Sequence, residues 1–255
     1  MRLVQTTANR LAKGPTLLLA DEPGRDWLLD TVRLYDPAVR QWRDRLVFTN
    51  GVLLFGPIAV TQKLLRQARL PAGVSAAYHC GLAVQSHNKR LSPDLKRQSA
   101  GLLLRGLATR LGATLHPGLP EPDLALMASV YSPHAVNAEQ VIRVLHPHAP
   151  GLAVYGEHPS GDGSFDLASD EAALFVGYLP AQQFLIDFEP PALGELGRQR
   201  LHHYDLKTGA RASESPRDLC LTLGQAALAL ASHADGVAID MYGFRFTRPE
   251  DLLPG

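Results

Sequence analysis

The segment Val52-Leu-Leu-Phe-Gly-Pro-Ile-Ala-Val60 has a counterpart in Ala128-Ser-Val-Tyr-Ser-Pro-His-Ala-Val136. Each is an apolar run followed by a small residue, proline, any residue and Ala-Val. A stretch of helical character follows each copy, over 61–70 and 137–146, and stops at proline and glycine. A second apolar run follows each stop. This succession predicts a repeated strand–helix–strand unit.

A second match lies downstream and covers a helix and the strand after it. The segments that begin at Ser92-Pro93 and Ser215-Pro216 run in step to Gly112 and Gly236. Serine suits the N-cap of a helix and proline its first turn. Each glycine stands where the helix would end and an apolar strand begin. The larger offset of this second match places an insertion in the second copy, near residues 157–205.

The order of elements predicts the fold class. β-α-β followed by α-β is the order of a ferredoxin-like unit. We therefore expect an α+β protein of two diverged ferredoxin-like repeats, with mostly antiparallel sheets and helices on one face. The insertion is expected to be rich in β-structure, since four runs within it have strand character: 164–167, 173–178, 184–188 and 200–204.

Domain boundaries follow from the repeat. Residues 1–50 match neither copy, and we expect them as an N-terminal extension packed on the first repeat. The first repeat takes residues 51–118, and the second repeat, with its insertion, takes 123–255. A cluster of prolines between the two marks the linker.

Charge is divided unevenly along the chain. Residues 1–117 hold 17 Lys and Arg against 7 Asp and Glu, and residues 118–255 hold 8 against 18. Such asymmetry indicates an acidic partner for the first half. The alternative is that the two halves pack on each other and neutralise their fields.

The two repeated helices differ in their apolar surface. Helix 93–111 is amphipathic, with leucines over a broad arc and arginines on the outer face. Helix 216–234 is apolar on nearly all sides, which predicts deeper burial than for 93–111, or an interface. A protein partner or homodimer contact through helix 216–234 is therefore one hypothesis.

Motifs with a defined chemistry are missing from the sequence. There is no phosphate-binding loop, dinucleotide-binding glycine pattern, nucleophile elbow or His-Glu-x-x-His. The two cysteines fit no disulfide framework or zinc pattern. His202 and His203, if in a strand, would point to opposite faces and could not chelate one ion together. We therefore expect no cofactor and no metal.

Two sets of residues are candidates for binding. The basic set of the first half comprises Arg43, Arg45, Lys89, Arg90, Arg97 and Arg105. Arg and Lys supply phosphate contacts, so this set favours nucleic acid, whereas the sparse aromatic residues and zero net charge argue against it. The second set is Asp240 and Tyr242, which strand alternation over 237–246 places on one face, where they could bind a ligand or move a proton.

Without a catalytic constellation, the sequence favours a non-enzymatic binding or interaction protein of a regulatory or toxin-neutralising kind. The second hypothesis is a nucleic-acid-binding protein that uses the basic first half. The third is an enzyme with a site at the repeat interface near Asp240 and Tyr242. Apolar runs are too short to span a membrane and the first residues lack a signal-peptide pattern, so we expect a cytoplasmic protein without a membrane partner.

Overall fold

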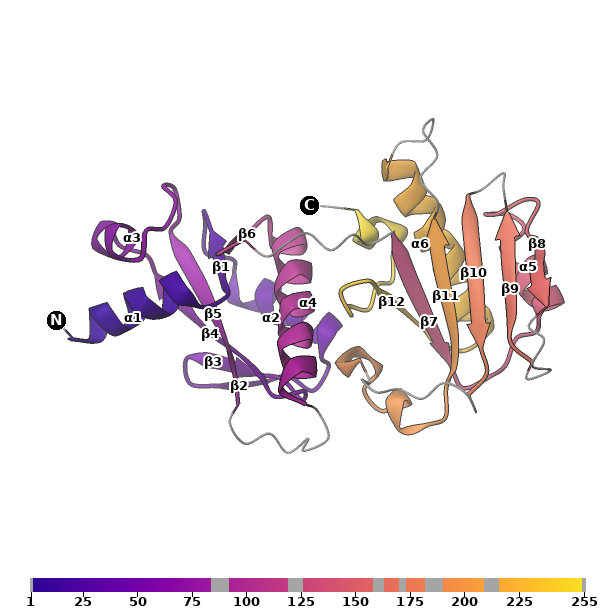
Figure 1. Cartoon of the computed structure of the whole chain (residues 1–255), viewed down its shortest axis with the longest axis horizontal. Coiled ribbons are helices and arrows are strands. Elements are labelled where there is room, and N and C mark those ends of the chain that lie inside the picture. Colours follow the sequence, from indigo (N-terminus) through magenta and orange to yellow (C-terminus); the bar gives the residue numbers. More distant parts are fainter. Residues whose placement is uncertain are drawn as a thin grey trace. The chain divides into compact units, whose positions relative to one another are not determined.

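The chain folds into two compact units, which divide after Glu121 (Figure 1). The computed structural model describes residues 2–83, 92–118, 126–157, 163–169, 173–181, 190–208 and 216–253. Each unit is a six-stranded antiparallel sheet with helices packed on it, so the predicted α+β class is confirmed. None of the described helices has the length and apolar composition needed to cross a membrane.

Helices are interspersed among the strands in both units. Those of unit 1 are α1 (Arg2–Lys13), β1 (Thr16–Leu19), α2 (Arg25–Tyr35), β2 (Arg40–Trp42), β3 (Arg45–Val47), β4 (Val52–Ala59), α3 (Gln62–Ala68), β5 (Ala76–Leu82), α4 (Pro93–Leu111) and β6 (Thr114–His116). Those of unit 2 are β7 (Met127–Ser132), α5 (Ala138–Leu145), β8 (Ala153–Glu157), β9 (Phe165–Ser169), β10 (Leu174–Leu179), η1 (Pro191–Leu193), η2 (Leu196–Arg198), β11 (His202–Thr208), α6 (Pro216–His233), β12 (Val237–Asp240) and η3 (Pro249–Leu252).

The sheet of unit 1, sheet A, has the strand order β2-β3-β4-β5-β1-β6. All neighbouring strands are antiparallel. If the hairpin β2–β3 is set aside, the remaining strands follow the 4-1-3-2 order of a ferredoxin-like sheet, with α2 and α4 as the crossover helices. The hairpin extends this sheet beyond β4, and α3 occupies the connection between β4 and β5.

The sheet of unit 2, sheet B, has the order β12-β7-β11-β10-β9-β8. This is again the 4-1-3-2 order, with β9 and β10 placed between its third and second strands. Three of the four strand runs expected in the insertion are present as β9, β10 and β11. The fourth, 184–188, lies outside the described residues. Both strand orders fit the ferredoxin-like repeat.

The strand orders of the two sheets relate the two units in a different way from the first sequence match. β7 lies between β12 and β11, and the corresponding place in sheet A belongs to β1, whereas the matched segment 52–60 forms β4. Residues 1–50 therefore contribute three strands of sheet A. The downstream match agrees with the topology, because α4 and α6 each lead into the last strand of their unit. An apolar run before a proline resembles any buried strand, so the first match carried no topological information.

Helices lie on both faces of sheet A (Figure 1). One face is covered by α1 and α3, whose core consists of Ala8, Leu11, Leu18, Leu64, Ala68, Leu70 and Ala77. α2 and α4 contact each other on the opposite face. There the Tyr35 hydroxyl lies 2.7 Å from Ser99 Oγ, and Asn50 Nδ2 donates to both. This buried network ties α2 and α4 to the turn before β4.

In unit 2, α5 and α6 pack on one face of sheet B. The buried residues of α6 include Cys220, Leu223, Ala226, Ala227, Leu230 and Ala231, and those of α4 include Ser99, Ala100, Leu103, Leu104, Leu107 and Leu111. Gly224 and Ala234 are also buried in 216–234, as is Gly106 in 93–111, so the two segments are buried to a similar extent and the predicted deeper burial of 216–234 is not confirmed. The apolar surface of α6 packs against sheet B, α5 and η3, and a partner contact through this helix stays a hypothesis.

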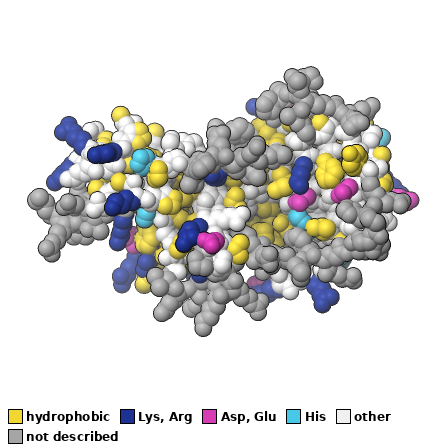
Figure 2. Space-filling view, in the orientation of Figure 1, with side chains coloured by type: hydrophobic (Ala, Val, Ile, Leu, Met, Phe, Trp, Pro, Cys, Tyr) yellow, Lys and Arg dark blue, Asp and Glu magenta, His cyan; other side chains and the backbone are white. Residues whose placement is uncertain are grey.

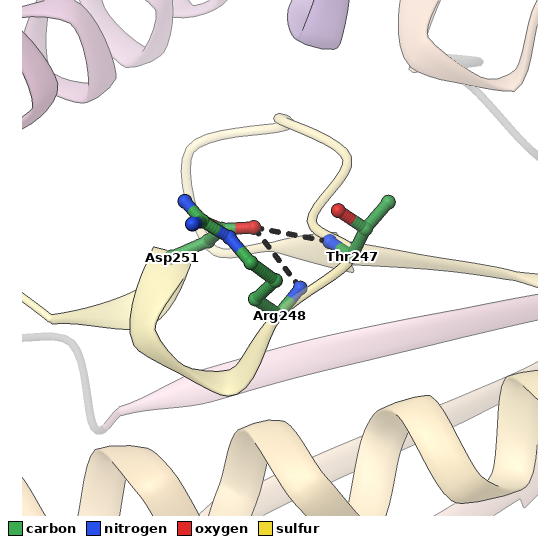
Figure 3. Close-up of polar contacts among 3 residues, drawn as sticks. All are labelled: Thr247, Arg248 and Asp251. Carbon is green, nitrogen blue, oxygen red and sulfur yellow. Dashed lines mark hydrogen bonds and ion pairs between the residues drawn. The ribbon is translucent and has the colours of Figure 1, made fainter.

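A carboxylate caps η3, the short helix that packs against α6 (Figure 3). Asp251 Oδ2 accepts hydrogen bonds of 3.1 Å from the backbone N–H groups of Thr247 and Arg248. The Arg248 guanidinium lies 2.9 Å from Asp251 Oδ1. Burial raises the pKa of Asp251, but these donors and the adjacent charge together lower it below its ordinary value.

Because the folded pKa of Asp251 is lowered, its contribution to stability is present above the unfolded-state pKa and is lost as pH falls through the folded-state value. We expect Asp251→Asn to lower the free energy of unfolding at pH 7, with a difference from wild type that shrinks below about pH 4. Urea unfolding across this pH range measures it. Asp30→Asn, in an exposed pair with Arg33, should change little at any pH. An Asp251→Asn difference that is constant with pH would contradict the assignment.

The close packing of η3 on α6 predicts a cost for any side chain at Gly224. A Cβ there would lie 2.7 Å from Pro249 Cα, closer than real Cβ atoms approach. Gly224→Ala should lower the free energy of unfolding by about 1–3 kcal/mol through overpacking. Gly101→Ala is the matched control, since a Cβ on that α4 glycine meets nothing within 4 Å. It should be neutral or raise stability by up to about 1 kcal/mol; equal effects of both changes in urea unfolding would refute the packing argument.

Candidate functional site

The described members of the basic set proposed from the sequence lie in two places. Arg43 and Arg45 are on the β2–β3 hairpin and Arg97 and Arg105 are on α4, whereas Lys89 and Arg90 lie outside the described residues. Among the four described arginines, those of the hairpin stack on the same ring.

Sheet A aligns one side chain from each of four neighbouring strands. Trp42 of β2 faces Arg45 of β3, which in turn faces Phe55 of β4. His79 of β5 lies opposite Phe55. Directly opposed residues of antiparallel strands point to the same face, so these four stand in one row. We call this row, with Arg43 in the adjoining turn, the hairpin strip.

Aromatic rings hold the arginines of the hairpin strip. The Cζ atom of Arg45 is 4.0 Å from the ring centroid of Trp42 and 5.5 Å from that of Phe55. The Cζ atom of Arg43 is 5.3 Å from the Trp42 ring. Such contacts contribute ~0.5–1 kcal/mol at exposed sites. Arg45 Nε is buried without a hydrogen-bond partner in the described part of the chain, so stacking positions this side chain.

Two glycines make room for the inner rings of the hairpin strip. A Cβ on Gly81 would lie 3.1 Å from the Phe55 ring, so the ring leans over this glycine. A Cβ on Gly14, just after α1, would overlap with the His79 ring. Burial, and then the charge of Arg10, lower the pKa of His79. The imidazole is therefore uncharged at neutral pH and acts as a further flat, neutral ring.

Arg43 occupies a backbone position that suits glycine or asparagine. Its φ is 56°, in the left-handed region, at the turn of the β2–β3 hairpin. A non-glycine residue there costs ~1–2 kcal/mol relative to a right-handed conformation. Arg69, at the C-cap of α3, has a similar φ of 54°, so this strain by itself assigns no function to Arg43.

The outer end of the hairpin strip is open to solvent. Trp42 is 53% exposed, which is unusual for so large an apolar side chain. On the same face of sheet A, α1 and α3 carry four further exposed basic residues, namely Arg10, Lys13, Lys63 and Arg66. Figure 2 shows Lys and Arg side chains recurring over unit 1, at the left of the view, with few Asp or Glu among them. An exposed indole thus stands beside positive charge.

Sequence reasoning selected the arginines but missed their aromatic partners. Trp42 and Phe55 lie on strands joined through β3, and only the register of β3 reveals that they flank one guanidinium. The pattern Trp-Arg-Asp-Arg over 42–45 was the available signal, since a two-residue loop places Trp42 opposite Arg45.

The structure corrects the proposed pairing of Asp240 and Tyr242. β12 ends at Asp240 and a turn follows, so the alternation that placed both side chains on one face does not extend to Tyr242. Asp240 is buried, and its Oδ1 accepts hydrogen bonds from the backbone N–H groups of Tyr242 and Phe244. The carboxylate therefore holds the turn after β12 through this oxygen.

Unit 2 has a separate polar cluster on the face of sheet B opposite α5 and α6. Asp205 Oδ1 accepts a hydrogen bond of 2.8 Å from Ser129 and lies 3.1 Å from His203 Nε2. In a nucleophilic triad the serine would instead bond to the histidine. Tyr131 stacks on His203 with centroids 4.7 Å apart. This cluster is a buried network that joins β7 to β11, and its geometry does not activate the serine.

Metal binding and similarity to known proteins give no further site. Within the described ranges, no group of three or more His, Cys, Asp or Glu side chains is placed to hold a metal ion. His202 bonds to Tyr178 whereas His203 stacks on Tyr131, so the adjacent histidines point to opposite faces as predicted.

No protein-family model, curated protein or solved structure matches the chain.

The left-handed conformation of Arg43 predicts that glycine stabilises this turn. Arg43→Gly should raise the free energy of unfolding by up to about 1 kcal/mol, because the relief of ~1–2 kcal/mol exceeds the ~0.5–1 kcal/mol that glycine's flexibility costs. Arg69, the C-cap of α3 with φ 54°, is a matched control. Arg69→Gly should stabilise to a similar extent in urea unfolding. A loss of stability on Arg43→Gly alone would show that its stacking outweighs the backbone strain.

Proposed function

We propose that the chain is a non-enzymatic binding protein that holds single-stranded nucleic acid on the hairpin strip. The observation that carries this proposal is the exposed Trp42 ring, fixed beside the stacked guanidinium of Arg45. Proteins that bind single strands combine aromatic platforms for the bases with basic side chains for the backbone. The strip supplies both within one row of a sheet.

The surroundings of the strip support the same ligand. RNA-recognition motifs stack bases on aromatic residues of a four-stranded sheet. In unit 1, α1 and α3 cover part of the face that carries the strip, and the outer end with Trp42 is open, so the analogy is one of stacking chemistry and not of ancestry. The strip lies in the half of the chain that holds 17 Lys and Arg against 7 Asp and Glu. This local excess of positive charge weakens the objection from zero net charge, since counterion release depends on the charges at the contact.

Two pairs of matched variants test the proposal by fluorescence anisotropy of a labelled single-stranded oligonucleotide at several salt concentrations. Trp42→Ala should weaken binding about tenfold or more, because base stacking contributes ~1–3 kcal/mol per base. Trp27→Ala, which removes an indole that is 50% exposed on α2, should leave the affinity unchanged. Arg43→Gly should weaken binding and reduce the log–log salt slope by about 0.7, and Arg69→Gly should change both much less.

The control variants distinguish binding at the hairpin strip from nonspecific attraction of nucleic acid to positive charge. Arg43→Gly and Arg69→Gly each remove one charge and relieve one left-handed residue, so equal effects of the two would argue against a site at the strip. The proposal fails if wild-type protein shows no saturable binding to single-stranded RNA or DNA at low salt. Preference for a duplex of the same length would also contradict it, because paired bases cannot stack on Trp42.

A further inference from the structure

The open part of the hairpin strip has a defined length. Its row of side chains crosses four neighbouring strands, from Trp42 on β2 to His79 on β5. Neighbouring strands lie about 4.8 Å apart, so the row measures roughly 14 Å from its first ring to its last. Trp42 is exposed, and Phe55 and His79 are half-buried. All three residues therefore keep some of their surface open to a ligand along this length.

The end of α1 closes the row beyond His79. Thr16 of β1 is the next residue in the row, since it lies opposite His79 in sheet A. Thr16 is fully buried, and its hydroxyl donates a hydrogen bond of 3.1 Å to the Gly14 carbonyl. Gly14 itself lies against the His79 ring. A bound strand that follows the row from Trp42 therefore meets the end of α1 after His79.

The last turn of α1 adds a cation at this inner end. The row's own charge lies at its hairpin end, where Arg43 stands in the turn between β2 and β3. Arg10 and Lys13 are the basic residues of the last turn of α1, and both are exposed. It is Arg10 whose charge lowers the pKa of His79, so its guanidinium lies close to this ring. An exposed guanidinium therefore stands at each end of the row of rings.

We infer that the hairpin strip holds about three successive nucleotides of the bound strand, with Arg43 and Arg10 on two different phosphates. This inference rests on the proposed function. An RNA-recognition motif stacks two or three bases on the aromatic residues of a four-stranded sheet, and the open row crosses the same number of strands. Arginine contacts to phosphate position a strand without reading its bases. The strip therefore selects a strand by its length, since only a strand that reaches from one guanidinium to the other makes both contacts.

The first test measures affinity and salt dependence for labelled oligothymidylates of increasing length, from the dinucleotide upwards, by fluorescence anisotropy. The affinity of wild type should rise steeply up to about three nucleotides and slowly beyond. Arg10→Gln should reduce the log–log salt slope by about 0.7 for the trinucleotide and for longer strands. Arg97→Gln removes the same charge from α4, on the opposite face of sheet A, and should change the slope much less.

A second measurement assigns each guanidinium to its phosphate. One linkage of a tetrathymidylate at a time is replaced by an uncharged methylphosphonate, and each strand is titrated with wild type, Arg43→Gly and Arg10→Gln. Removal of the contacted charge should cancel the effect of the matching variant, because the coupling between the two partners is then lost. We expect the effects of the two variants to be cancelled at different linkages.

The position of Arg10 is checked without any ligand. NMR titration should show a higher pKa for His79 in Arg10→Gln than in wild type, because the positive charge that lowers it has been removed. The signal of His79 is identified by its loss in His79→Gln. An unchanged pKa would place Arg10 away from the row and overturn the inference, whatever the protein binds.

The outcomes distinguish this inference from the proposed function. If both variants are cancelled at the same linkage, or if no linkage cancels Arg10→Gln, the inference is overturned and the strip stays in place. The same holds if affinity continues to rise steeply for strands much longer than the row. If wild type binds no strand of any length at low salt, the proposed function fails and the inference fails with it.

Discussion

The cross-strand register of β3, β4 and β5 is the constraint on which the candidate site depends. Because Arg45 faces Phe55 and Phe55 faces His79, side chains far apart in sequence share one row. A slip of one residue would turn every side chain of the slipped strand to the opposite face and dissolve the row. The register of β4 against β5 shifts directly after Phe55, so the alignment of the row ends at this residue.

The hairpin strip joins an exposed apolar ring and a stacked guanidinium. Trp42 is 53% exposed, and the guanidinium of Arg45 lies over its ring. His79, kept neutral by burial and by Arg10, extends the row of rings without adding charge. The charge is thus concentrated at the hairpin end of the row. Arg43 adds to it at a cost in backbone strain, so the proposed binding role and stability are opposed at this one residue.

The sequence was sufficient for the α+β class but not for the strand order or the site. Apolar runs, capping residues and the paired segments after Ser92 and Ser215 identified the α+β class and the last helix and strand of each unit. The first match misled because an apolar run before proline describes many buried strands, and 52–60 became β4 and not a first strand. Charge alone grouped Arg97 and Arg105 with the hairpin arginines. Only tertiary packing shows that α4 lies on the opposite face of sheet A from Trp42.

The place of β1 has a consequence for how unit 1 reaches its folded state. Thr16 pairs with His79 on one side and with His116 on the other, so β1 joins partners made much later in the chain. During synthesis this apolar strand stays without its neighbours until almost the whole unit has left the ribosome. Closure of such long loops precedes any gain from pairing, and it slows folding relative to sheets built from successive hairpins. The sheet that carries the hairpin strip is therefore completed by the first strand to be synthesised and the last.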